Sequence, residues 1–202
     1  MRSSPSPSFR RVAGNKSLAP VLVAVCEGAT ETKLLNDLKQ RWRLHSLRVI
    51  AIGQVGPPGK VVARARAERT KHDDAETWAV FDHDEHQCWS SALVVARKNS
   101  IQVAASNPCV ELWGLLLHRD HTAHIERGDA QRLLASVHPN YNHEKHPYFK
   151  PDVVVELLRA AEQRADQIGA RAESNGDPFG NPSTTFHRLL QRMSSSGFKA
   201  GT

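Results

Sequence analysis

Short apolar runs alternate with longer amphipathic segments as far as residue 120. Residues 20–26 form a continuous apolar run rich in valine, as in a strand that is buried on both faces of a sheet. Four such runs predict strands, at residues 20–26, 47–52, 77–81 and 101–105. A segment with helical spacing follows each run, at residues 33–42, 60–70, 87–98 and 110–118. This alternation predicts an α/β fold in which about four parallel strands, joined by right-handed crossovers, are flanked by helices.

The rest of the chain has a more helical pattern, which predicts a helical extension of residues 121–193 after a core of residues 19–120. Its helices are expected at residues 129–137, 152–172 and 183–193. Predicted helix starts carry capping side chains at Thr30, at Asp152, and at Ser183 or Thr184. Residues 1–18 are expected to form a disordered basic arm that is either solvated or bound to nucleic acid, and residues 194–202 a flexible tail.

The composition is that of an ordinary globular protein with a basic charge balance. Of 202 residues, 40% are apolar and 24% are charged, and the formal net charge is +6. Such a balance favours a polyanionic partner, because Lys and Arg displace counterions from phosphates. No apolar run is long enough for a membrane span or a secretion signal. Because Cys26, Cys88 and Cys109 lack C-x-x-C spacing, we expect reduced thiols in a cytoplasmic protein without a zinc ribbon.

Carboxylates follow two of the predicted strands: Glu27 comes directly after the first, and Asp82 and Asp84 come after the third. Ligands of parallel α/β sheets bind outside the carboxyl ends of the strands, so these side chains converge if the two strands are neighbours. Three carboxylates at one edge repel each other unless a cation lies between them, and Mg²⁺ or Mn²⁺ prefers oxygen ligands. A cation held there can bind phosphate oxygens and activate water for phosphodiester cleavage. Taken singly, Asp82 or Asp84 fits a helix cap equally well.

Several motifs of the chain resemble those of the RloB family. V-C-E-G-A-T-E at residues 25–31 is similar to the family's V-C-E-G-x-T-E, and V-F-D-H-D-E-H at residues 80–86 is similar to its V-F-D-x-D-x-H. The most specific match is S-N-P-C-V-E-L-W at residues 106–113, where Val110 replaces a usual Phe and Gly114 follows as an additional residue. Two shorter elements, Y-F-K at residues 148–150 and N-P-S-T at residues 181–184, resemble the family's Y-x-K and N-P-S-T.

The resemblance implies a fold similar to the TOPRIM domain of topoisomerases, primases and OLD-type nucleases. It makes Glu27 a metal ligand or general acid/base, and Asp82 and Asp84 ligands of Mg²⁺. It also implies a nuclease of bacterial antiviral defence that cleaves RNA, such as tRNA, or DNA, with an ATPase partner encoded nearby. One alternative is a non-catalytic subunit that binds nucleic acid or a partner and regulates such an ATPase. Another is an enzyme that hydrolyses or transfers a small nucleotide at the same acidic site.

Six further residues are candidates for contacts at this site: Glu31, His86, Ser106, Asn107, Glu111 and Lys150. Lys150 would stabilise charge on a phosphoryl oxygen, or it is a surface lysine. Glu111 is an additional ligand, or a first-turn glutamate that favours the helix dipole. Ser106 and Asn107 contact phosphate or shape a turn. His86, directly after the D-x-D pair, contacts the site or is a solvated loop histidine.

Basic and aromatic residues outside these motifs have two interpretations each. The predicted helix at residues 60–70 carries Lys60, Arg64, Arg66 and Arg69, which either follow a phosphate backbone or form a solvated face. Core positions are expected, in preference to base stacking, for the four tryptophans: Trp42, Trp78, Trp89 and Trp113.

Overall fold

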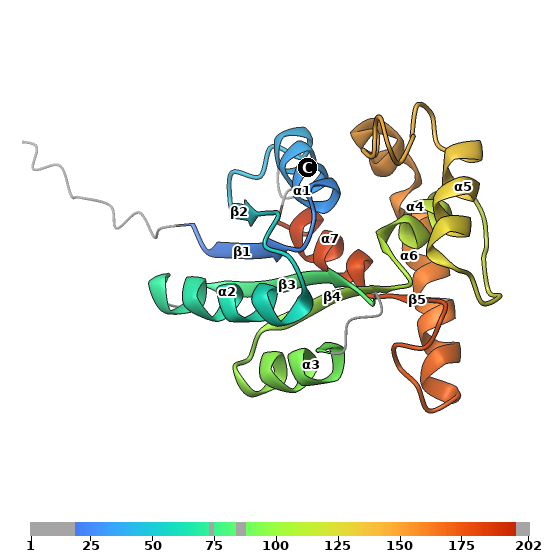
Figure 1. Cartoon of the computed structure of the whole chain (residues 1–202). Helices are drawn as coiled ribbons and strands as arrows, with labels where there is room; N and C mark the ends of the chain where they lie inside the picture. Colours follow the sequence, from blue (N-terminus) through green and yellow to red (C-terminus); the bar gives the residue numbers. More distant parts are fainter. Residues whose placement is uncertain (1–18, 73–74, 84–87, 197–202) are drawn as a thin grey trace, which may run out of the picture.

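The computed structural model describes residues 19–72, 75–83 and 88–196. In this part of the chain five strands form one sheet: β1 (Val21–Cys26), β2 (Arg48–Ile52), β3 (Glu76–Asp82), β4 (Gln102–Asn107) and β5 (Ser183–Thr184). Their order is β2-β1-β3-β4-β5, with β5 antiparallel to β4 and the other pairs parallel. The predicted α/β fold is confirmed as a Rossmann-like arrangement (Figure 1).

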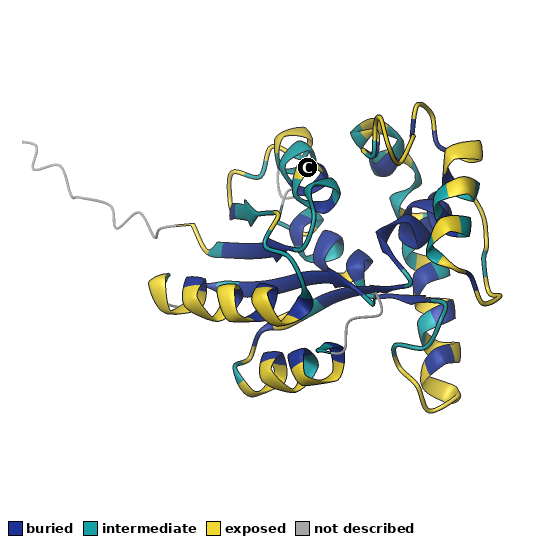
Figure 2. Cartoon of the chain, in the orientation of Figure 1, coloured by how far each residue is buried: buried dark blue, intermediate teal, exposed yellow. Residues whose placement is uncertain are grey.

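Helices cover both faces of the sheet. On one face lie α1 (Ala29–Arg41) and α7 (Phe186–Ser194), and on the other lie α2 (Pro58–Lys71) and α3 (Trp89–Lys98) (Figure 1). Successive side chains of β1 enter the two cores in turn, Leu22 and Ala24 on the α1 side and Val23 and Val25 on the α2 side. Figure 2 shows the strands buried between helices whose outer faces are exposed. The valine-rich run of β1 therefore follows from burial on both faces.

The helical extension packs beside the carboxyl ends of the strands. Its helices α5 (Arg127–Val137) and α6 (Pro151–Ser174) pack against α4 (Val110–His118), the last helix of the predicted core, which is buried along nearly its whole length. The additional Gly114 has a packing function, because a Cβ atom there would overlap with the ring of Phe149 and lie 3.0 Å from Leu134. The glycine thus lets the segment before α6 approach α4 closely.

A short strand replaces the expected start of the last helix. Ser183 and Thr184 were expected to begin that helix, but they pair with Asn107 and Ser106 as β5, and α7 begins at Phe186. Thr184 Oγ1 also lies 2.8 Å from Ser106 Oγ, and the segment continues to a backbone hydrogen bond from Thr185 N to Ala105 O at 2.7 Å. Pairing with the sheet edge therefore overrides the helical tendency of these residues.

Two predicted helix caps were also wrong. Helix α1 begins at Ala29 with Gly28 at its N-cap, so Thr30 lies inside the helix; Thr32 Oγ1 donates to Gly28 O at 2.7 Å. Helix α6 begins at Pro151, whose fixed φ suits the first helical position, so Asp152 lies two residues after the N-cap position, Lys150, and does not cap the helix. Asp152 instead accepts a hydrogen bond from Arg41 Nε at 2.7 Å.

The tryptophans occupy the expected core positions, whereas a phosphate-binding role for the basic face of α2 stays a prediction. Arg64 Nη2 lies 2.9 Å from Glu68 Oε1, and Arg69 Nη1 donates to Ser100 O at 2.7 Å, so two arginines of α2 are engaged within the fold. Three of the tryptophans are buried and Trp42 packs against the core, as expected.

Some expectations fall outside the described residues: the arm at residues 1–18, the end of the tail at residues 197–202, and the site residues Asp84 and His86. Within the described ranges, all three cysteines are free, and every helix is too short or too polar to cross a membrane.

Candidate functional site

The strand order reverses between β1 and β3. From β1 the chain crosses one face through α1 to β2, and then returns over the other face through α2 to β3. In a doubly wound sheet of this order, ligands bind at the carboxyl ends of the two strands where the direction changes. The first and third strands are neighbours, which is the condition for their carboxylates to converge, since Cys26 is in register with Val80.

Glu27 and Asp82 meet at this switch point. Glu27 follows the last residue of β1, and its backbone N–H donates to Val80 O at 2.9 Å, which continues the sheet by one residue. Its carboxylate Oε2 accepts a hydrogen bond of 3.2 Å from the backbone N–H of Asp82, the last residue of β3. Two of the three predicted carboxylates therefore converge; the third, Asp84, lies outside the described residues.

Arg127 joins the site from a remote part of the chain. It is the first residue of α5, and its Nη2 lies 3.0 Å from Asp82 Oδ2. A cation at a helix N-terminus faces the positive end of the dipole, so the negative charge of Asp82 offsets an unfavourable position. Arg127 could not be predicted as a site residue, because it lies 45 positions from Asp82 along the chain and belongs to no recognised motif.

Glu31 places another carboxylate beside this pair, from the first turn of α1. The side chain is buried, and Oε2 has no hydrogen-bond partner among the described residues. Its pKa is raised to about 7, chiefly by burial and then by the negative charges of Glu111 and Glu27, against the opposing charge of Arg127. Glu31 therefore lies in a pocket with an excess of negative charge.

Gly28 makes room for this carboxylate. The φ of Gly28, −113°, is open to any residue, so the backbone conformation does not require a glycine there. A Cβ atom at Gly28 would instead lie 2.9 Å from Glu31 Oε2, closer than real Cβ contacts come. The glycine is thus needed for the close approach of Glu31.

Glu111 completes the acidic edge from the first turn of α4. It is buried; its Oε1 accepts a hydrogen bond from Tyr141 Oη at 2.7 Å and lies 3.3 Å from His143 Nδ1. The pKa of Asp82 is raised well above its ordinary value, first by burial and then by the charges of Glu31 and Glu111, against Arg127. Tyr141 is a second residue that sequence reasoning missed. We call Glu27, Glu31, Asp82 and Glu111 the acidic edge.

Ser106, Asn107 and Lys150 are the remaining candidates that the structure describes, and Ser106 of β4 is in register with Asp82. Ser106 bonds to Thr184, and Asn107 Nδ2 donates to Phe179 O at 2.6 Å, so both side chains anchor the segment around β5. The backbone N–H of Lys150 donates to His138 Nε2 at 3.0 Å, and its exposed side chain lines a surface hollow. A charge-stabilising role for Lys150 stays a prediction.

The donors of the acidic edge suit a hard divalent cation, which prefers carboxylate oxygens. Glu31 Oε2 is buried and has no hydrogen-bond partner among the described residues. The carboxylates also raise one another's pKa, as expected where negative charge is in excess. Within the described ranges, however, no three His, Cys, Asp or Glu side chains are arranged as a metal cluster. The described residues therefore fit such an ion in chemistry and supply part of a coordination shell.

A family model described as RloB-like protein matches residues 22–193. The chain belongs to the RloB-like family. In the corresponding searches, no curated protein and no solved structure matches it.

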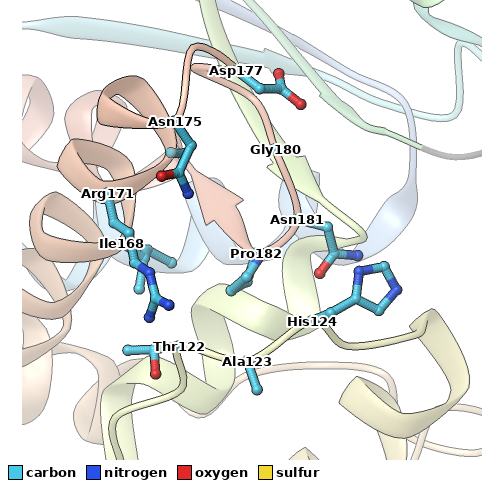
Figure 3. Close-up of a pocket in the computed structure, with 11 residues that line it drawn as sticks. Thr122, Ala123, His124, Ile168, Arg171, Asn175, Asp177, Gly180, Asn181 and Pro182 are labelled. Carbon is cyan, nitrogen blue, oxygen red and sulfur yellow. The ribbon is translucent and has the colours of Figure 1, made fainter.

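The RloB-like N-P-S-T element holds Arg127 in place. Asn181 Oδ1 accepts a hydrogen bond from Ile125 N at 3.0 Å, and Asn181 Nδ2 donates to Ile125 O at 2.8 Å. This two-point contact fixes the backbone two residues before Arg127. Asn181 also lines a separate hollow of about 390 Å³, opposite Arg171 of α6 and Asn175, the residue that follows this helix (Figure 3).

Proposed function

We propose that this RloB-like chain is a Mg²⁺- or Mn²⁺-dependent nuclease that cleaves nucleic acid at the acidic edge. The observation that carries the proposal is the 3.2 Å contact between Glu27 Oε2 and Asp82 N, with Glu31 and Glu111 buried beside it. Among the residues that the structure describes, Arg127 is the cationic residue that forms an ion pair with Asp82. A divalent ion would balance the remaining charge.

The roles of the residues follow from their positions. Glu27 and Asp82, with Asp84, would hold the ion. When bound, it would polarise a phosphoryl oxygen and supply a water of lowered pKa for phosphodiester hydrolysis. Arg127 lies where it would stabilise negative charge on the phosphoryl group. Tyr141 would keep the Glu111 carboxylate in place through their 2.7 Å hydrogen bond.

Nucleic acid as substrate is supported by the basic net charge and by the acidic constellation typical of metal-dependent phosphodiesterases. The likeness to TOPRIM domains, the role in antiviral defence and the ATPase partner are parts of the proposal that rest on the motif resemblance. Membership of the RloB-like family is consistent with them.

A cleavage assay tests the proposal. The purified full chain is incubated with tRNA, single-stranded RNA, single-stranded DNA and plasmid DNA, in Mg²⁺, in Mn²⁺ and in EDTA. We expect metal-dependent cleavage that Glu27→Gln lowers by about 10²-fold or more, as when a group that stabilises the transition state is lost. Glu173→Gln, an exposed change on α6, is the matched control and should leave the rate unchanged. Equal rates for the Glu27→Gln variant and the wild type would refute the assignment.

One observation favours a second candidate function. The 3.0 Å ion pair between Arg127 and Asp82 neutralises Asp82 without any added cation. A chain that only binds nucleic acid or a partner ATPase, and regulates it, would keep this arrangement. Tight binding that is unchanged by metal, together with intact substrates in every metal, would favour this regulatory function.

A further inference from the structure

Two hollows adjoin on the surface beside the acidic edge. The first, of about 440 Å³, is lined by Ala29, Thr32 and Gln54, and the second, of about 600 Å³, by Tyr141, His146 and Lys150. Lys33 and Tyr148 line both hollows. We call the two hollows together the Tyr148 groove; each has the volume of an ordinary small-ligand site.

Tyr148 differs from the other aromatic residues of the described ranges. Its side chain is 38% exposed, and it is the aromatic member of a short set of exposed large apolar residues that otherwise contains valines. The ammonium of Lys33 lies 5.5 Å from the centre of its ring. An exposed aromatic ring beside a cation is the arrangement on which unpaired bases stack in single-stranded nucleic-acid sites.

The charges of the groove suit a phosphate backbone. The ammonium of Lys150 forms no ion pair with the residues that the structure describes, so it is available to a phosphate. Lys33 pairs with Asp37 at 2.7 Å, and a phosphate would compete with that carboxylate for it. Amide side chains that can contact bases line both hollows, including Asn36 and Gln54 in the first and Asn140 in the second.

Each hollow is lined by a residue that adjoins the acidic edge. Ala29, in the first, is two residues beyond Glu27, and Tyr141, in the second, donates its hydroxyl hydrogen bond to Glu111. Gly53 keeps the first hollow narrow, because a Cβ atom there would overlap with Thr32 of α1. A strand lying in the groove would thus run alongside the buried carboxylates.

We propose that the Tyr148 groove binds single-stranded nucleic acid, with a base stacked on Tyr148 and phosphates at Lys150 and Lys33. A duplex keeps its bases stacked inside and offers no base face to the ring of Tyr148, so we expect a duplex to bind more weakly than a single strand. The cleavage of a strand bound in the groove rests on the proposed nuclease function, whereas its binding there does not depend on that function.

Fluorescence anisotropy of the full chain in EDTA, where cleavage is suppressed, tests the groove. The probes are one short labelled sequence as single-stranded RNA, as single-stranded DNA and as duplex DNA. We expect Tyr148→Ala to weaken binding of a single strand by about 10-fold and Tyr148→Phe by about 2-fold or less. Lys150→Ala should weaken binding and reduce the salt slope by about one, whereas Lys98→Ala, an exposed change on α3, should do neither.

The outcomes separate the groove from the nuclease. The proposal that the groove binds a single strand is refuted if a folded Tyr148→Ala variant keeps wild-type affinity, or if duplex and single strand bind equally well. This holds even if the chain cleaves nucleic acid. If Tyr148→Ala does not fold, Tyr148→Leu replaces it, and equal affinity of the Leu and Phe variants is then the contrary result. If binding depends on Tyr148 but no metal supports cleavage, the proposed binding role of the groove is supported and the proposed nuclease function is refuted. The RNA and DNA probes distinguish the two sources of a single strand.

Discussion

Glu31 and Glu68 are two glutamates that are each 4% exposed, in helices on opposite faces of the sheet. Basic side chains surround Glu68: its carboxylate lies 2.9 Å from Arg64, 3.7 Å from Lys71 and 3.6 Å from His72. Glu31 lies among other carboxylates, and its Oε2 has no hydrogen-bond partner among the described residues.

The difference shows how a structural carboxylate is distinguished from one placed for chemistry. The partners of Glu68 come from its own helix or the residue that ends it, three or four positions away, and they satisfy its charge locally. At the acidic edge the chain supplies Arg127 to Asp82 and leaves Glu31 with an excess of negative neighbours. Such an imbalance costs stability and is typical of functional sites.

The largest expected effect is on cleavage. Asp82→Asn keeps the shape of the side chain and removes its charge, and we expect the rate of nucleic-acid cleavage to fall by about 10³-fold. The midpoint of thermal unfolding should stay near that of the wild type, because relief of the repulsion from Glu31 and Glu111 offsets the loss of the ion pair with Arg127. Both quantities are measured on the purified chain in Mg²⁺. Glu68→Gln is the matched control: the same kind of change at the structural carboxylate should leave the cleavage rate within about 2-fold. If the Glu68 variant cleaves slowly while the Asp82 variant is fully active, the assignment of Glu68 as structural and Asp82 as functional is contradicted.

The next effect is the pH dependence of stability. The pKa of Glu31 is raised from its ordinary value of 4.5 to about 7 in the folded chain, so the folded state holds the proton more tightly than the unfolded state does. The resulting stability is present below pH 4.5 and is lost as pH rises through 7, by roughly 3 kcal/mol in all. Urea unfolding of the wild type and Glu31→Gln across this range measures it. The difference between the two chains isolates Glu31 from His138, whose pKa is lowered to about 4 by burial and neighbouring charges and which acts in the opposite direction.

Mg²⁺ sharpens the same measurement. A divalent ion at the acidic edge would stabilise ionised carboxylates, so adding it at pH 8 should raise the urea midpoint of the wild type more than that of Glu31→Gln. Parallel pH profiles of the two chains, with no response to Mg²⁺ in either, would contradict a cation site.

A smaller effect is expected at the structural carboxylate. Glu68→Gln should destabilise the chain by about 1–2 kcal/mol, because Arg64 and its other partners lose their counter-charge. Arg64 and Lys71 are themselves largely exposed, so the loss should shrink at high salt. Urea midpoints at low and high salt at pH 8 test this. A gain of stability, as expected for Glu31→Gln under these conditions, would show that the two sites do not differ.

Features that depend on local pattern could be predicted from the sequence. The apolar runs indicated the parallel strands, and the rule for carboxyl ends placed Glu27 and Asp82 together. Arg127, Tyr141 and β5 were missed, since each depends on a contact between segments far apart in the chain. Thr184, for instance, reads locally as a helix start, and only the edge of β4 makes it a strand residue.

The smallest effect probes this remote contact. Asn181 makes both hydrogen bonds to Ile125, so Asn181→Ala should cost about 1 kcal/mol of stability and loosen the backbone that carries Arg127. Because Arg127 lowers the pKa of both Glu31 and Asp82, the pH profile of cleavage should shift to higher pH in this variant. A merely structural role would leave that profile in place. Asn175→Ala, in the same hollow with an exposed side chain, is the control (Figure 3). Identical pH profiles for the Asn175 and Asn181 variants would mean that the N-P-S-T element stabilises the fold without positioning Arg127.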